Sequence, residues 1–163
     1  MKVYIKNKLV SIGGSSEVLN ENNETLYEVK GKIISPTKKK EIYDGQGKLL
    51  YTIRNKYWTF FVNRVFVFDA QKNKIATIKK NKWSFNAKFE IEDCVDSMSI
   101  EGKFFSRTCK ILRNEQVVGT IVKDFTLLKD AYTLEADEKD IPFLTALVVA
   151  FDNLKDKKEE DRD

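Results

Sequence analysis

The chain has 163 residues, of which 42% are apolar and 33% charged, and 29 basic against 25 acidic side chains give a net charge of +4. This size and composition favour one globular domain with a sizeable core. The sequence contains no histidine, which excludes histidine acid–base catalysis, histidine-activated nucleophiles and metal sites with a histidine ligand. Its two cysteines, Cys94 and Cys109, are too few for a structural zinc site or a disulfide-rich scaffold.

The charge is uneven along the chain. Residues 1–82 carry 17 basic and 7 acidic side chains, whereas residues 83–163 carry 12 and 18. Lysines interrupt the N-terminus, so we expect no signal peptide. The longest apolar stretch, residues 141–151, has 11 residues, and a bilayer span needs roughly 20. We therefore expect a cytoplasmic protein with reduced thiols.

The elements follow a repeated pattern from the N-terminus onward. A first strand is expected near residues 3–12. Five strand–turn–strand segments follow, each with apolar residues on both sides of a polar turn, at residues 18–29, 41–53, 66–78, 89–100 and 110–121. A last strand is expected at residues 131–135. The pattern predicts an all-β domain with about twelve strands.

A helix is expected after the last strand. Asp140 is a suitable N-cap, and Pro142 suits the first helical turn. From Phe143 to Phe151 almost every residue is apolar, so the helix has no polar face and must be surrounded on all sides. Short antiparallel strands avoid exposed edges by closing on themselves. The sequence therefore predicts a closed twelve-stranded antiparallel β-barrel around a central hydrophobic C-terminal helix.

One spacing leaves two interpretations open. Ile75 and Ile78 are three residues apart, so in a regular strand they would face opposite sides of the sheet. Either a β-bulge shifts the alternation, or apolar side chains cover part of the outside of the barrel.

Three features occur in order over residues 1–154. They are Tyr4–Lys8 leading into Ile12–Gly14, a repeated aliphatic-x-Thr-Ile-x-Lys motif followed by Trp or Phe, and the terminal run Phe143–Asp152. Together they resemble the LURP-one-related family, within the tubby C-terminal-like superfamily that also includes the phospholipid scramblases. The resemblance implies a twelve-stranded barrel around a hydrophobic helix, in one domain over residues 1–154. We expect the charged residues 155–163 to form a disordered tail.

The resemblance implies less about function. Tubby domains bind phosphoinositide headgroups through paired basic residues, but the surrounding motif is not recognisable here. Scramblases act at membranes with a calcium link, and this sequence lacks the ligand pattern and central glycine of an EF-hand. The calcium link therefore does not transfer.

Candidates for catalysis are few. No histidine can activate the thiol of Cys94 or Cys109, and both cysteines fit a role as small, partly buried hydrophobic residues. Glu90 and Glu92 share one face of a strand, which is typical of a solvated surface. Asp44-Gly45 is a hairpin turn signal rather than part of a phosphate loop. We expect no catalytic residues, no metal site, no cofactor and no enzymatic activity.

Basic residues provide the candidate binding site. Equivalent positions of the repeats should lie at the same end of the barrel, which predicts a basic rim of Arg54, Lys56, Lys79, Lys80 and Lys82. A second cluster, Lys38, Lys39 and Lys40, follows Pro36. Aromatic residues beside lysines suit a membrane interface, although Trp58 and Trp83 also fit as hydrophobic links between hairpins. The charges also fit an ordinary solvated surface.

Two hypotheses of function follow. The first is a non-enzymatic module that associates peripherally with anionic phospholipid headgroups. The second is a structural or protein-interaction domain with an unknown protein partner and no lipid ligand. Lysines outnumber arginines 24 to 5, which argues against sequence-specific nucleic-acid recognition. We expect a monomer.

Overall fold

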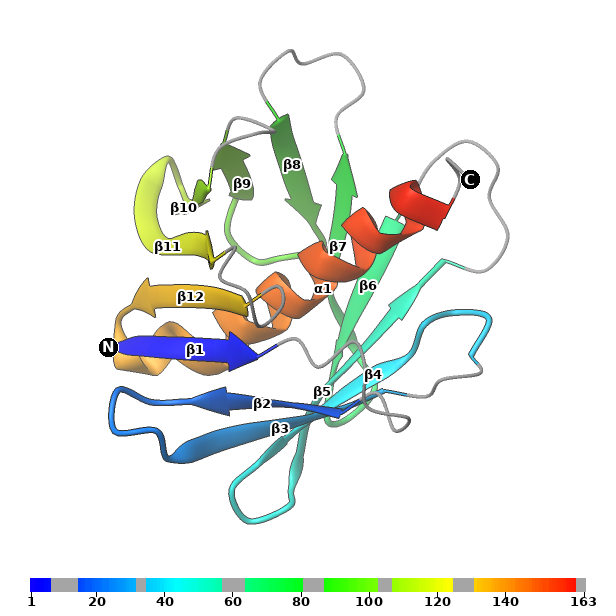
Figure 1. Ribbon diagram of the computed structural model, residues 1–163. Coiled ribbons are helices and arrows are strands. Elements are labelled where there is room, and N and C mark those ends of the chain that lie inside the picture. Colours follow the sequence, from blue (N-terminus) through cyan, green and yellow to red (C-terminus); the bar gives the residue numbers. More distant parts are fainter. Residues whose placement is uncertain are drawn as a thin grey trace.

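The computed structural model describes residues 1–6, 15–31, 35–56, 64–80, 87–102, 107–124 and 131–160, with the backbone alone for Lys80, Ala87, Asp124 and residues 155–160. Twelve β-strands and one long α-helix lie in these ranges (Figure 1). The strands are β1 Lys2–Lys6, β2 Ser15–Leu19, β3 Thr25–Gly31, β4 Lys40–Asp44, β5 Leu49–Asn55, β6 Arg64–Asp69, β7 Lys74–Lys80, β8 Ala87–Glu92, β9 Met98–Gly102, β10 Thr108–Arg113, β11 Gln116–Asp124 and β12 Ala131–Ala136.

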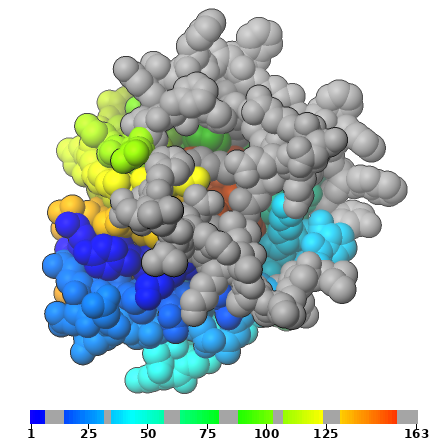
Figure 2. Space-filling view, viewed as in Figure 1, coloured from blue at the N-terminus to red at the C-terminus, as the bar shows by residue number. Residues whose placement is uncertain are grey.

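Antiparallel pairing closes the sheet into a barrel. Each strand pairs with its neighbours in the chain, and β1 also pairs with β12, from Lys2 opposite Glu135 to Lys6 opposite Ala131. In the space-filling view the dark blue surface of β1 borders the orange surface of β12 (Figure 2). The closed twelve-stranded barrel predicted from the repeats is confirmed.

A β-bulge explains the spacing of Ile75 and Ile78. The pairing of β6 with β7 shifts between Val67, opposite Ala76, and Phe68, opposite Lys74, so Ile75 is an extra residue. Ala76 and Ile78 are both fully buried. Three other hairpins have the same shift, with Leu26, Leu50 and Val118 as extra residues. The bulge is therefore part of the repeat, and the first of the two interpretations is correct.

The helix α1, Ile141–Glu160, follows a short 3₁₀-helix, η1, at Glu138–Asp140. It runs through the middle of the barrel (Figure 1). Leu144, Leu147 and Val148 are fully buried, and the Phe151 ring meets the ring of Phe89 edge-on at 4.8 Å between centroids. The predicted central helix is confirmed. Its backbone continues six residues past the domain boundary expected at residue 154.

The connections between strands alternate between the two ends of the barrel. One end, called the hairpin end, has the connections at residues 20–24, 45–48, 70–73, 93–97, 114–115 and 137–140. The opposite end, called the basic end, has those at residues 7–14, 32–39, 56–63, 81–86, 103–107 and 125–130. Because α1 follows the hairpin end, its C-terminal half points toward the basic end.

Candidate functional site at one end of the barrel

The connections of the two ends differ in composition. Those of the basic end contain nine basic residues, one acidic residue and nine of the chain's 19 aromatic residues, including both tryptophans. Those of the hairpin end contain three basic residues, eight acidic residues and no aromatic residue. By sequence, the two sets of connections therefore carry opposite net charge.

A row of basic residues crosses the outer wall at the basic end. The backbone N–H of Lys56 donates to the carbonyl oxygen of Arg64 at 2.9 Å, and Arg64 lies opposite Lys79 on β7. Asn55 and Val65, which neighbour residues of this row along the chain, are buried. Because successive side chains of a strand point to opposite faces, the row itself faces outward. The sequence analysis predicted Lys56 and Lys79 at one end but missed Arg64, which stands alone before the third repeat without a lysine cluster to mark it.

Arg54 lies on the same face of β5 as Lys56. Its side chain is exposed, and its guanidinium carbon lies 4.5 Å from the centroid of the Phe68 ring. Lys56 is exposed as well. Among the described residues, neither Arg54 nor Lys56 has a carboxylate within ion-pair distance. Within the described ranges both cations therefore differ from Lys39 and Lys79, which are paired with carboxylates.

Two of the lysines predicted to bind an anion, Lys39 and Lys79, already form ion pairs with carboxylates of this chain. Lys79 forms ion pairs with Glu90, at 3.3 Å, and with Glu92. Hydrogen bonds to these two carboxylates raise the pKa of Lys79 above its ordinary value. Lys39 pairs with Glu41. An external anion at Lys39 or Lys79 would therefore have to displace a carboxylate of this chain.

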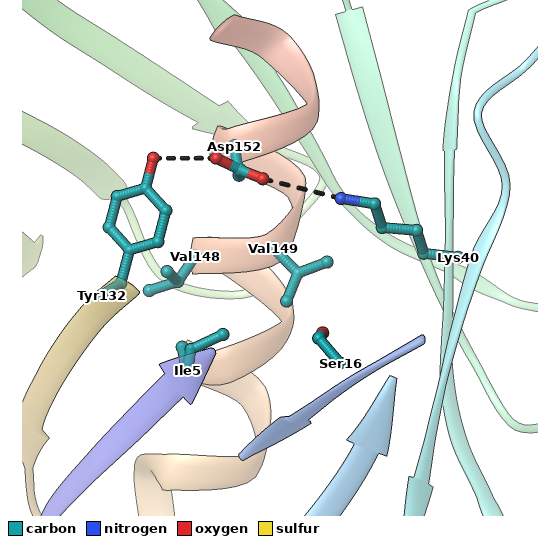
Figure 3. Close-up of a pocket in the computed structure, with 7 residues that line it drawn as sticks. All are labelled: Ile5, Ser16, Lys40, Tyr132, Val148, Val149 and Asp152. Carbon is teal, nitrogen blue, oxygen red and sulfur yellow. Dashed lines mark hydrogen bonds and ion pairs between the residues drawn. The ribbon is translucent and has the colours of Figure 1, made fainter. Parts of the chain in front are cut away.

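Lys38 and Lys40 contact Asp152 and Asn153, in the C-terminal half of the central helix, instead. Asp152 of α1 lies between Lys40 and Tyr132 of β12 (Figure 3). Its Oδ1 accepts a hydrogen bond of 2.8 Å from the Tyr132 hydroxyl, and its Oδ2 lies 3.6 Å from Nζ of Lys40. Next along α1, the Asn153 amide donates to the carbonyl oxygen of Lys38 at 3.0 Å. The helix is thus tied to the chain just before β4.

A small cavity of about 10 Å³ lies beside this contact. Its lining combines polar groups with an apolar floor, and consists of Ile5, Ser16, Lys40, Tyr132, Val148, Val149 and Asp152 (Figure 3). A cavity of roughly 10–15 Å³ holds one water-sized group. This volume therefore accommodates the tip of a ligand rather than a whole small molecule.

Two buried acceptors near the same helix turn lack donors. The side-chain amide of Asn55 donates to the backbone carbonyl oxygen of Asn153 at 3.4 Å. The amide oxygens of both residues are buried and have no hydrogen-bond partner among the described residues. The sequence analysis missed Asn55, Tyr132, Asp152 and Asn153. The polar pair Asp152-Asn153, directly after the apolar run, was a signal that the sequence analysis placed inside the domain without giving it a role.

Several predicted residues lie outside the described ones. These are Lys82, Trp58 and Trp83, together with the side chain of Lys80. The backbone of Lys80 ends β7 at the basic end. The predicted rim thus has Arg54, Lys56, Lys79 and the Lys80 backbone at one end of the barrel, with Lys38, Lys39 and Lys40 beside them at the start of β4.

The described residues were also considered for catalysis and metal binding. Burial, followed by the charge of Asp93, raises the pKa of Cys94 to about 11, and its thiol donates to the carbonyl oxygen of Ile75 at 3.4 Å. Within the described ranges, no three Cys, Asp or Glu residues are arranged to hold a metal ion. Over the same ranges, no helix has the length and apolar character to cross a bilayer.

Comparisons with known proteins identify relatives of the chain. Residues 1–152 match the LURP-one-related family. An X-ray structure of a protein from Arabidopsis thaliana is similar, with a TM-score of 0.65 and 19% sequence identity over 94% of this chain and 90% of that chain. At this identity the likeness shows the fold alone. Among curated proteins the comparison finds no match.

Proposed function

We propose that this chain, which belongs to the LURP-one-related family, is a non-enzymatic binding module that docks its basic end onto membranes containing anionic phospholipids. The observation that carries the proposal is the composition of the two barrel ends. Basic and aromatic residues gather in the connections of one end, and acidic residues in those of the other.

Membrane interfaces favour this combination. Anionic headgroups attract each nearby Lys or Arg with about 1 kcal/mol, and aromatic side chains settle at headgroup level. The acidic hairpin end is repelled by the same surface. The two effects act together to orient the barrel with its basic end toward the lipid. Arg54 and Lys56 are the described cations best placed for headgroup contact, because no described carboxylate pairs with them.

The chemistry of the described side chains supports a binding role over catalysis. The Cys94 thiol, with its raised pKa, is a poor nucleophile near neutral pH. Glu90, Glu92 and Glu101 form ion pairs on the outer wall. No histidine is present in the chain. These features favour a module whose contribution is recognition.

Vesicle binding tests the proposal. Phosphatidylglycerol and phosphatidylcholine vesicles should be compared at low and physiological salt, with tryptophan fluorescence as the readout, since both tryptophans belong to basic-end connections. We expect salt-sensitive binding to phosphatidylglycerol alone, because salt screens exposed charges over about 8 Å. The double variant Arg54→Glu/Lys56→Glu should weaken binding by at least about thirty-fold.

The matched control changes the same charge at the opposite end. Lys48 and Lys139 are exposed and lie in hairpin-end connections. Lys48→Glu/Lys139→Glu should keep most of the binding. Equal loss in both double variants would reduce the effect to net charge and contradict end-on docking. Absence of salt-sensitive binding to phosphatidylglycerol would reject the lipid hypothesis and favour the protein-interaction domain.

A further inference from the structure

The polar groups around Asp152 and Asn153 of α1 are hydrogen-bond acceptors, whereas the charged side chains near them are basic. The turn of α1 at Asp152 and Asn153 contains the Asp152 carboxylate, which lines the cavity, and the buried amide oxygen of Asn153, and the Asn55 amide donates to the backbone carbonyl oxygen of Asn153. The two amide oxygens have no donor among the described residues. Buried acceptors in proteins are nearly always paired. In the cavity itself, the Asp152 carboxylate and the hydroxyl oxygens of Ser16 and Tyr132 can accept hydrogen bonds, so the cavity suits a group that donates them.

The surroundings of this cavity attract the opposite charge. Lys40 lies 3.6 Å from Asp152, which is beyond hydrogen-bond distance, so the ion pair leaves the Lys40 ammonium able to bind a second anion. Arg54, on the adjacent strand β5, and Lys56, directly after that strand, are exposed. A complementary ligand must carry N–H donors at one point and a negative group next to them.

We propose that the basic end recognises the headgroup of an aminophospholipid, with its primary ammonium at the Asp152 cluster and its phosphate at Lys40. This inference rests on the proposed function and names the headgroup class of the same site. A phosphate in the inner position would meet the Asp152 carboxylate, and like charges in a poorly solvated site repel strongly. An ammonium in that position would lie next to the Asp152 carboxylate, which already has the Lys40 ammonium on its other side. Positive and negative groups would then alternate.

The size of the cavity makes the inference more specific. Its volume of about 10 Å³ accommodates one water-sized group. A primary ammonium has that size and three N–H donors, as a lysine ammonium has. The trimethylammonium of choline is larger and has no N–H donor. Serine and ethanolamine headgroups offer a primary ammonium of this kind, whereas choline and glycerol headgroups do not.

Four vesicle types separate this inference from the proposed function. Phosphatidylserine and phosphatidylglycerol have the same net charge, but phosphatidylserine carries an ammonium and a carboxylate in its headgroup. Phosphatidylethanolamine and phosphatidylcholine form a neutral pair that differs in the ammonium alone. We expect phosphatidylserine to bind about five-fold tighter than phosphatidylglycerol at equal mole fraction, the effect of an added charge-assisted hydrogen bond. Phosphatidylethanolamine should likewise bind more tightly than phosphatidylcholine.

Asp152→Asn tests the assigned residue. The variant should bring the ratio of phosphatidylserine to phosphatidylglycerol binding close to one while it keeps phosphatidylglycerol binding. Glu101→Gln makes the same change of charge on the outer wall, where Glu101 pairs with Lys88 at 2.8 Å, and should leave the ratio unchanged. Melting curves establish that both variants fold. The comparison of the four vesicles uses the wild-type chain and needs no variant.

The outcomes are distinct. Equal binding of phosphatidylserine and phosphatidylglycerol, both above phosphatidylcholine, would overturn the aminophospholipid and leave the proposed function standing. No preference for phosphatidylglycerol over phosphatidylcholine would contradict the proposed function itself. Soluble phosphoethanolamine that binds as tightly as phosphatidylserine vesicles would assign the site to a free phosphorylated amine and overturn the lipid headgroup.

Discussion

Two turns of the hairpin end are stabilised by Asp side chains that bond to the backbone of the same turn, whereas at the basic end the polar contacts of α1 join segments far apart in the sequence. Oδ1 of Asp44 accepts from the backbone N–H groups of Gln46 and Lys48, both at 2.9 Å. Oδ1 of Asp69 accepts from that of Asn73 at 2.8 Å. Such bonds within a turn are the reason that Asp and Asn are favoured there.

The contacts that α1 makes at the basic end join residues far apart in the sequence. The Asn153 amide bonds to the carbonyl oxygen of Lys38, 115 residues away. Tyr132 and Asp152 come from β12 and α1. The turn bonds pair groups of the same turn. Around α1, in contrast, the amide oxygens of Asn55 and Asn153 have no hydrogen-bond donor among the described residues. The contacts of α1 at the basic end thus depend on the tertiary structure, whereas the bonds within a turn depend on neighbouring residues.

The largest effect is expected from a substitution in α1, because the core around this helix supports both ends of the barrel. Leu147 of α1 is fully buried in the barrel. Leu147→Asp should prevent folding, because an unpaired buried charge costs several kcal/mol, on the order of the whole stability. Circular dichroism during heating measures the loss. Val117→Asp is the control at an exposed position near the hairpin end; a Leu147→Asp variant that melts like wild type would contradict the central helix.

A glycine at each end gives the next comparison. A Cβ on Gly102, at the basic end, would lie 2.7 Å from Sγ of Cys109 and 3.0 Å from the carbonyl oxygen of Thr108. Gly102→Ala should destabilise the fold by about 1–3 kcal/mol through overpacking. Gly45, in a hairpin-end turn, has no atom within 4 Å of such a Cβ, so Gly45→Ala should be nearly neutral.

Urea unfolding measures both glycine variants. Adding Cys109→Ala to Gly102→Ala should recover part of the lost stability, because it removes the closer of the two contacts. No recovery would show that the backbone contact with Thr108, rather than the thiol, sets the cost.

The smallest expected effect concerns acid stability at the hairpin end. A hydrogen bond from Thr77, with help from Lys74, holds the pKa of Asp93 below its ordinary value. Asp93 therefore stabilises the fold above the ordinary carboxyl pKa of about 4, and this contribution is lost as the pH falls through the lowered pKa. Melting temperatures from pH 6 downward should fall less steeply for Asp93→Asn.

Asn suits this test because Asp93 has a φ of 66°, a left-handed conformation that Asn tolerates well. A parallel fall in wild type and variant would show that Asp93 does not contribute to acid unfolding. A Lys74→Met variant, which removes one of the two stabilising partners, should lie between them.

Much of the fold could be predicted because its signals are local. Alternation within each strand identified the hairpins, and an apolar run after Asp140 identified the helix. The order of these features also identified the LURP-one-related family, which the comparison confirms. The bulge at Ile75 was one of two open interpretations, since the spacing shows that the alternation breaks but not how the partner strand responds.

The candidate site could be predicted only in part. Equivalent repeat positions correctly suggested that Arg54, Lys56 and Lys79 lie at one end of the barrel. The ion pairs of Lys79 depend on the register of β7 against β8, where Lys79 is opposite Glu90. Register is a property of two segments, so the pattern of one segment did not reveal that Lys79 is already paired.

By itself, the sequence determined which side chains face inward, where the turns fall and that the helix needs complete enclosure, because these follow from periodicity and from the polarity of neighbouring residues. Only the tertiary structure decided that Asp152 and Asn153 are buried and that they meet Lys40, Lys38 and Asn55. The physical reason is closure of the barrel. The antiparallel strands place their connections alternately at the two ends of the barrel. Closure of the barrel around α1 then brings Asp152 and Asn153 against Lys38 and Lys40, more than a hundred residues away in the sequence.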